Sequence, residues 1–403
     1  MTRSDEKSGP GSRRASGAQG ARNHLQELIG KKKVLLCVGS GGVGKTTTSA
    51  ALALAAAREG RRVLCLTIDP AKRLANSLGL EEMKQEETLV APEIFERAGV
   101  SVKGTLTVMM LDTKATFDDI VRKHASTPAA RDAILGNKIY AYVSTSLAGT
   151  QEYMAMEKLQ ALREGGAYDL IVLDTPPTAN ALDFLDAPER MIEAIDSPAM
   201  RWFVQAFTGK NRSGGRLAMN LLGKGSQLVL KAVGKITGAA FLDQLAGFIA
   251  AINDLFGGFT ERAKRVSETL RGPEVAFVLV TSPEPMAIAE INFFAERLRA
   301  FAMPRDVFVV NRVHMPPGEL LDPRALAAVL EGVELPADDD FVRRVSRAHE
   351  DAQLLAVRDA KHLEKLHLET DGAATPVVRV PAFDSDVHDV RALARVAEAL
   401  VGG

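Results

Sequence analysis

A short glycine-rich stretch near the start of the chain has the residue types and spacing of a phosphate-binding loop. It follows an apolar run and consists of Gly39, Ser40, Gly41, Gly42, Val43, Gly44, Lys45, Thr46 and Thr47. The fixed positions of the pattern G-x-x-x-x-G-K-[ST] are all filled. Glycines let successive backbone N–H groups turn toward a phosphate, and the helix that follows presents its positive N-terminal end. The stretch therefore predicts nucleoside triphosphate binding, with Lys45 at the β- and γ-phosphates and the Thr46 hydroxyl on Mg²⁺.

Two aspartates follow apolar runs and could complete a hydrolytic site. Asp69 comes after Val63–Ile68, and Asp174 comes after Leu170–Leu173 and is followed by Thr-Pro-Pro-Thr. In an open α/β sheet the carboxyl ends of neighbouring strands lie beside the phosphate loop. Asp69 could orient the water that attacks the γ-phosphate, or it could be a turn or helix-capping residue. Asp174 is predicted to hold Mg²⁺ through water.

The elements that must position these residues alternate along the chain. Short apolar runs alternate with longer helical patterns, which is typical of a mainly parallel sheet covered on both faces. The predicted strands are 34–38, 63–68, 106–111, 170–173, 275–280, 307–310 and 377–380. The fold class is therefore α/β, a P-loop NTPase with a doubly wound, mainly parallel sheet and a helical insertion subdomain.

Two long segments are helical in pattern. Residues 187–271 form the predicted helical insertion, and residues 339–369 form a second long helical segment expected to pack on the core. Residues 197–242 contain no Asp or Glu but several Lys and Arg. This part of the insertion is either a solvated, flexible lid or a surface for an apolar client or an anionic lipid headgroup.

Composition limits the class of protein. The formal net charge of the 403-residue chain is −1, so capture of nucleic acid by overall charge is not expected. Cys37 and Cys65, the two cysteines, both lie in apolar runs and are expected to be buried thiols in a reducing cytoplasm. Residues 1–28 are rich in Ser, Gly and Arg and are interpreted as a disordered tail preceding one ATPase domain at 29–403. No apolar run is long enough to cross a membrane.

Taken together, these motifs resemble the ArsA family, which includes the arsenite-pump ATPase and the ATPase that targets tail-anchored membrane proteins. The residues that carry the resemblance are Gly39–Thr47, Asp69-Pro70-Ala71, Asp174–Thr178, Asn311, and Val380-Pro381 with Asp386 and Asp389. The resemblance covers about residues 33–400. It implies an ATP- and Mg²⁺-dependent dimer in which Asp69 positions water, Asn311 contacts adenine and Pro381 begins a segment flanking the base.

The chain departs from the family pattern in three places. It lacks the metalloid-binding cysteines of the arsenite pump, and soft As(III) favours thiolates, so arsenite is not expected as ligand. It also lacks the C-x-x-C zinc pair of the targeting ATPase. Ser40 stands where many family members have a lysine that reaches the partner's phosphate. A homodimer would therefore hydrolyse slowly, or the chain forms a heterodimer with a paralogue that keeps the lysine.

Three functions remain open from the sequence. The leading one is a cytoplasmic ATPase, peripheral to the membrane at most, that couples dimer closure to a helical subdomain and handles hydrophobic membrane-protein clients or a membrane partner. The second is a positioning switch of the MinD/ParA kind, although residues 389–400 lack a strongly basic polar face. The third is a slowly hydrolysing regulatory subunit.

Overall fold

The computed structural model of this chain consists of two compact units. It describes residues 10–68, 73–80, 85–138, 140–141, 144, 150–176, 185–190, 192–193, 198, 258, 260–319, 321–366, 369–370 and 373–402. The first unit contains Met1–Met110, Tyr168–Ala181 and Pro273–Gly403, and the second contains Leu111–Ala167 and Leu182–Gly272.

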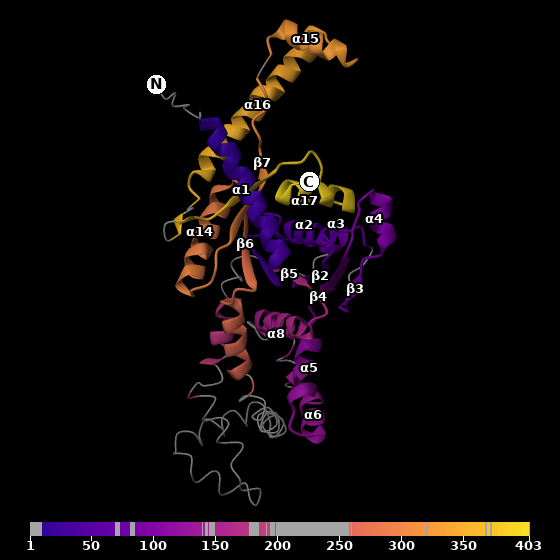
Figure 1. The fold of residues 1–403 in the computed structure, drawn as a ribbon, viewed down its shortest axis with the longest axis vertical. Helices are drawn as coiled ribbons and strands as arrows, with labels where there is room; N and C mark the ends of the chain where they lie inside the picture. Colours follow the sequence, from indigo (N-terminus) through magenta and orange to yellow (C-terminus); the bar gives the residue numbers. More distant parts are fainter. Residues whose placement is uncertain are drawn as a thin grey trace, which may run out of the picture. The chain divides into compact units, whose positions relative to one another are not determined.

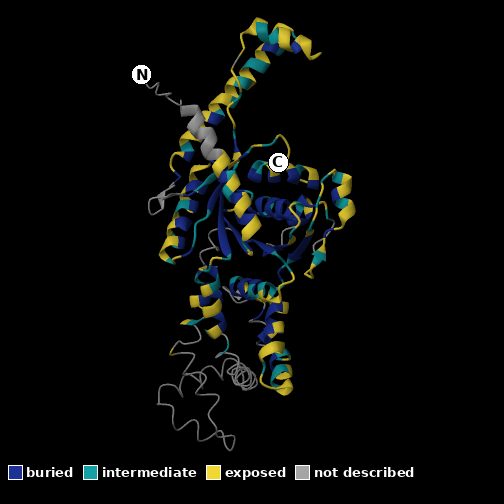
Figure 2. Ribbon diagram, viewed as in Figure 1, coloured by how far each residue is buried: buried dark blue, intermediate teal, exposed yellow. Residues whose placement is uncertain are grey.

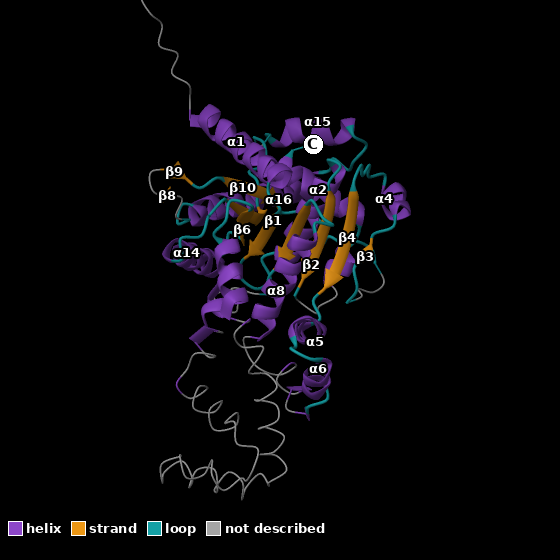
Figure 3. Ribbon diagram, turned by 60° about the horizontal axis from the view of Figure 1, so that its bottom comes forward, coloured by secondary structure: helices purple, strands orange, loops and turns teal. Residues whose placement is uncertain are grey.

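An eight-stranded sheet forms the centre of the first unit (Figures 1 and 3). Its strands are β1 (Val34–Val38), β2 (Arg62–Thr67), β3 (Thr88–Leu89), β4 (Thr105–Met110), β5 (Leu170–Asp174), β6 (Val275–Thr281), β7 (Val307–Val313) and β10 (Val377–Pro381). The strand order is β10-β7-β6-β1-β5-β2-β4-β3, and only β3 pairs antiparallel. The predicted parallel α/β sheet is confirmed, because each predicted strand lies within one of these strands except for at most one residue at its end.

Helices cover both faces of this sheet. Those of the first unit are α1 (Pro10–Lys31), α2 (Lys45–Arg58), α3 (Arg73–Ser77), α4 (Pro92–Ala98), α14 (Pro285–Ala300), α15 (Pro323–Gly332), α16 (Asp339–Leu363) and α17 (Val390–Val401). The connection from β1 to β2 runs in the opposite direction across the sheet from that between β6 and β7. Because such crossovers are right-handed, α2 and α14 lie on opposite faces. α17 packs beside α2, and α16 contacts α14.

The core of this unit is built on α2 and the central strands. Every residue of β1, β5 and β6 is buried, as expected for strands covered on both faces (Figure 2). Along α2 the run Ala50–Ala57 is buried without interruption. Cys37 and Cys65 are buried free thiols within β1 and β2, as the sequence predicted.

Residues 10–28 depart from the expectation of a disordered tail at 1–28, whereas residues 1–9 lie outside the described part of the chain. Residues 10–28 belong to α1, and Leu25, Leu28 and Ile29 are buried in the core of the first unit. α1 contacts α17 and β10, which come from the other end of the chain. The local composition is too polar to reveal this, since the apolar partners are supplied by distant segments.

The second long helical segment is shorter than predicted. α16 ends at Leu363 rather than continuing to residue 369, and Glu364 caps it. Residues 369–370 instead form β8, which pairs antiparallel with β9 (Ala373–Ala374). The sequence between these strands is Asp-Gly, a dipeptide typical of two-residue hairpins, and the helical periodicity did not take it into account.

The second unit is helical in its described part. It contains α5 (Thr113–His124), α6 (Pro128–Leu135) and α8 (Thr150–Gly165), and residues 185–190 and 260–270 are also helical. This unit therefore includes residues 111–167, which the sequence analysis assigned to the sheet domain. Most of the predicted insertion at 187–271, including 199–257, lies outside the described residues. Among the described helices, none has both the length and the apolar character needed to cross a bilayer.

Candidate nucleotide-binding site

The glycine-rich stretch lies between β1 and α2 and has a backbone that requires glycine. Gly42 and Gly44 have φ values of 80° and 93°, which side-chain-bearing residues rarely adopt. A Cβ at Gly39 would lie 2.0 Å from the Val280 carbonyl oxygen of β6. A Cβ at Gly44 would lie 2.2 Å from the Asn311 Nδ2 atom. The loop therefore packs closely against β6 and β7, and its backbone N–H groups lie at the N-terminus of α2.

Lys45 is buried at the start of α2, with only 7% of its surface exposed. Its ammonium donates a hydrogen bond of 2.8 Å to the Ser40 carbonyl oxygen across the loop. This contact holds the cation over the loop and close to where a phosphate would be bound. Gly41, Gly42, Gly44, Lys45, Thr46 and Thr47 all line one pocket of about 650 Å³, a size typical of small-ligand sites.

Asp174 closes the site from the end of β5. It pairs in the sheet with Cys37 of β1 and Thr67 of β2, so it lies at the centre of the strand ends. Its Oδ2 atom accepts hydrogen bonds from the Thr46 hydroxyl at 2.7 Å and the Thr67 hydroxyl at 3.0 Å. Carboxylate and hydroxyl oxygens in contact beside a phosphate cradle are the hard ligands that Mg²⁺ prefers. The residues present therefore fit a magnesium ion.

The far end of the pocket is formed by the segments that the family resemblance assigned to the base. Asn311, in β7, donates from Nδ2 to the Val43 carbonyl oxygen at 3.0 Å, which ties β7 to the loop. Pro381, Ala382 and Phe383 line the same pocket. The Phe383 ring is covered by the Arg395 guanidinium at 4.9 Å from its centroid. Residues from the ends of β1, β5, β7 and β10 are thus brought together, whereas Asp69 lies outside the described residues.

Several residues of the pocket were not found from the sequence. Arg312 and His314 follow Asn311 and also line it, and Arg312 has a left-handed φ of 58°. The His314 ring Nδ1 lies 2.7 Å from the Asp359 Oδ2 atom, which also accepts the His314 backbone N–H at 3.0 Å. Asp359 is a buried aspartate in α16, with no local sequence signal that would link it to residue 314.

Two buried titratable groups close to the pocket have shifted pKa values. Burial raises the pKa of Asp359. Hydrogen bonds from the His314 backbone, the His314 ring and Arg358 lower it by more than burial raises it, so the pKa lies below its usual value. This carboxylate therefore stays ionised at neutral pH. Burial raises the pKa of Cys37 to about 12, with the Asp174 charge acting in the same direction. The thiol beside Asp174 remains protonated and is a poor ligand for a soft metalloid.

Comparison with known proteins agrees with this site. The profile of the anion-transporting ATPases, ArsA_ATPase, matches residues 32–322. ATPase GET3 of Malassezia globosa is 29% identical over 42% of this chain and 47% of its own length. A protein of Aquifex aeolicus, named provisionally as an arsenical pump-driving ATPase, is 24% identical over 70% of this chain and 63% of its length. ATPase get3 of Aspergillus terreus is 26% identical over 72% and 77%, respectively.

The chain spans less than two thirds of the length of the first two of these relatives. The family match nevertheless covers well over half of this chain and includes β1, the phosphate-binding loop, Asp174 and Asn311. The chain belongs to the ArsA family of anion-transporting ATPases.

Proposed function

We propose that the chain hydrolyses ATP in a Mg²⁺-dependent reaction. The observation that supports this most directly is the convergence of Lys45 with the Thr46–Asp174 pair on one side of a pocket whose other side is formed by Asn311 and Pro381. The phosphates would lie on the loop, and the base between Asn311 and the Pro381 segment. Thr46 and Asp174 would hold the metal ion, which neutralises charge on the phosphates when bound.

The reaction transfers the γ-phosphoryl group to water and yields ADP, inorganic phosphate and a proton. Positioning and charge stabilisation account for most of what an enzyme contributes to this step. Lys45 places a positive charge where the β–γ bridging oxygen becomes more negative. Asp69, which follows the end of β2 by two residues in the sequence, is proposed to accept a hydrogen bond from the attacking water and align it with the leaving group.

The replacement Asp69→Asn tests this assignment. We expect the kcat for ATP hydrolysis to fall by about 10²- to 10³-fold, as expected when a group that acts on the attacking nucleophile is lost. The affinity for ATP should change little, because Asp69 is assigned to the water and not to the phosphates. Steady-state kinetics and nucleotide titration measure the two effects. Asp351→Asn, an exposed aspartate of α16, is the matched control, and undiminished turnover in Asp69→Asn would remove the assignment.

A slowly hydrolysing subunit is the second candidate, and Ser40 is the observation that favours it. The Ser40 side chain is buried at 6% exposure, and in the described part of the chain its hydroxyl has no hydrogen-bond partner. A short inward-facing hydroxyl cannot supply a positive charge to a second subunit. We therefore propose that the chain works as a dimer, either a slow homodimer or a heterodimer with a paralogue that has lysine at this position.

Ser40→Lys should raise the turnover of a homodimer by at least ~10-fold, since a cation acting in trans on a transferring phosphoryl group is worth 10³-fold or more in related enzymes. Ser40→Met is the matched control, because methionine is similar in length but has no charge. Rates are compared at saturating ATP, and native mass spectrometry after co-expression with the paralogue reports the subunit composition. Equal rates for the lysine and methionine variants would contradict a charge effect at this position.

The coupled process is proposed by analogy with the family. ATP binding and hydrolysis would drive dimer closure and move the helical unit, which would handle hydrophobic membrane-protein segments or contact a peripheral membrane partner from the cytoplasm. A MinD/ParA-like positioning switch is the alternative. Nucleotide-dependent crosslinking from residues 197–242 separates these functions: an apolar protein segment supports client handling, whereas crosslinks confined to the dimer partner count against it.

A further inference from the structure

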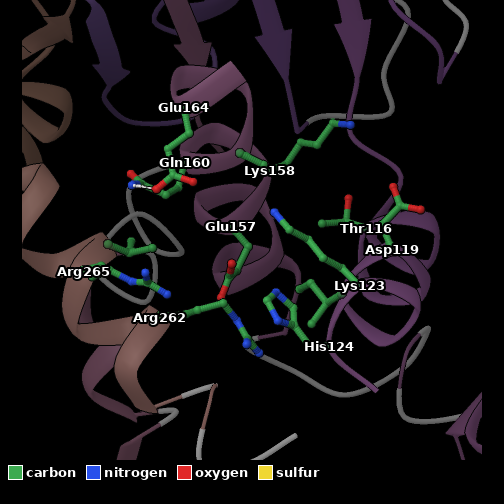
Figure 4. Close-up of a pocket in the computed structure, with 13 residues that line it drawn as sticks. Thr116, Asp119, Lys123, His124, Glu157, Lys158, Gln160, Glu164, Arg262 and Arg265 are labelled. Atoms are coloured by element: carbon green, nitrogen blue, oxygen red, sulfur yellow. Dashed lines mark hydrogen bonds and ion pairs between the residues drawn. The ribbon is translucent and has the colours of Figure 1, made fainter. Parts of the chain in front are cut away.

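A second pocket lies within the helical unit. It shares no lining residue with the candidate nucleotide-binding pocket. It has a volume of about 340 Å³ and is lined by α5, α8 and the helix at residues 260–270 (Figure 4). Its apolar wall includes the buried side chains Ile120 and Val266. Its polar wall carries more cationic than anionic side chains. Nothing in the proposed hydrolysis of ATP uses these residues.

The acidic groups of this pocket are already engaged. Glu157 and Arg262 are both 8% exposed and form an ion pair with an Nε–Oε1 distance of 3.2 Å. The Tyr153 hydroxyl donates to the same Glu157 oxygen. Glu164 accepts a hydrogen bond of 2.7 Å from Gln160, and Asp119 pairs with Arg122 at 2.9 Å. Glu157 and Asp119 are therefore compensated by cationic partners, whereas Glu164 keeps its negative charge because its donor is a neutral amide.

Three cations that line the pocket, Lys123, Lys158 and Arg265, lack such compensation among the described residues. In Figure 4 the Lys158 side chain extends away from Lys123 and His124. Within the part of the chain that the structure describes, Lys123 and Arg265 form no ion pair or side-chain hydrogen bond with another residue. Lys123 lies in the last turn of α5, where the helix dipole stabilises a positive charge, and this could explain the position of Lys123 without a ligand. That explanation does not extend to Arg265, which lies in the middle of the helix at 260–270.

The behaviour of His124 agrees with a positive potential in this space. Burial lowers the pKa of His124, and the charges of Arg262, Lys123 and Arg265 lower it further. The three cations therefore act on one imidazole from two helices. In Figure 4 the side chains of Lys123 and His124 extend from α5 into the same pocket as Arg262. A neutral imidazole there can donate one hydrogen bond to an acceptor oxygen.

We propose that this pocket binds a small oxyanion of the phosphate class, held chiefly by Lys123 and Arg265. Guanidinium and ammonium groups form their strongest hydrogen bonds with charged oxygens, and the buried Arg262–Glu157 pair fixes the floor of the site. The site would therefore take inorganic phosphate or the phosphate group of a small molecule. Lys123 and Arg265 are both exposed, so their attraction for an anion should weaken as the ionic strength rises.

Phosphate titration of the full chain tests this site. Calorimetry is carried out with potassium phosphate at constant ionic strength, with Mg²⁺ and ADP saturating the nucleotide-binding loop. We expect the double variant Lys123→Gln/Arg265→Gln to weaken phosphate binding by at least ~10-fold, through loss of two charge-assisted contacts. The matched control is Lys114→Gln/Lys264→Gln, because it removes the same charge from exposed positions of the same helices that do not line the pocket.

The outcomes are distinct. Unchanged affinity in the first double variant, an equal loss in the control, or no phosphate binding by the wild-type chain would each overturn the proposal. Arg265→Glu is a second variant that reverses one charge at an exposed position and should abolish binding without affecting the fold. ATP hydrolysis is measured in parallel, so loss of phosphate binding with normal hydrolysis, or the reverse, shows which of the two proposals fails.

Discussion

Replacing Lys45 with alanine is expected to lower the rate of ATP hydrolysis by about 10³-fold, the upper range for loss of one electrostatic group acting on the transition state. Lys45 is buried at the start of α2 and is held across the loop by its hydrogen bond to the Ser40 carbonyl. Its charge is therefore fixed before the nucleotide arrives, and no reorganisation is needed during the reaction. Alanine leaves the glycine backbone in place but removes this charge.

Steady-state phosphate release at saturating Mg²⁺ and ATP measures the effect of Lys45→Ala. Lys31→Ala is the control, because Lys31 is an exposed lysine at the end of α1 whose ammonium pairs only with Glu27 among the interactions of the described chain. The control should retain the wild-type rate. A Lys45→Ala variant with more than half of that rate would show that the loop does not act as proposed. Thermal unfolding of both variants separates loss of chemistry from loss of fold.

Asp174→Asn is expected to weaken Mg²⁺ binding by about 10- to 100-fold, comparable to the loss of a positioning group in other metal sites. Asp174 is 1% exposed and receives the hydroxyl hydrogen atoms of Thr46 and Thr67. Asparagine preserves the size of the side chain and one acceptor oxygen but removes the negative charge. The attraction for a divalent cation falls, whereas the hydrogen bonds can persist.

The Mg²⁺ concentration that gives half-maximal ATP hydrolysis reports this change. Thr67→Val is the comparison, since it removes one hydrogen bond to Asp174 and leaves the carboxylate charged. Its Mg²⁺ requirement should rise much less than that of Asp174→Asn. If both variants show the wild-type Mg²⁺ dependence, Asp174 does not hold the metal ion.

Sequence reasoning worked best where a function resides in consecutive residues. The glycine-rich loop, its flanking strand and helix, and Asp174 at a strand end lie in the elements that the sequence predicted, because local periodicity and a contiguous motif determine them. The β8–β9 pairing and the end of α16 at Leu363 were missed, because a helical periodicity was extended across an Asp-Gly hairpin signal. Asp69 remains a prediction from its position after a strand.

What the sequence determined by itself was the α/β architecture, the phosphate-binding loop and the class of chemistry it can support. Only the tertiary structure decided that residues 10–31 form a helix packed on the other end of the chain, and that Asp359 of α16 holds His314 at the pocket. Only the fold brought Lys123 and Arg265 to one cavity. Contacts between segments tens to hundreds of residues apart leave no local pattern, since each partner alone has the composition of an ordinary surface or helix.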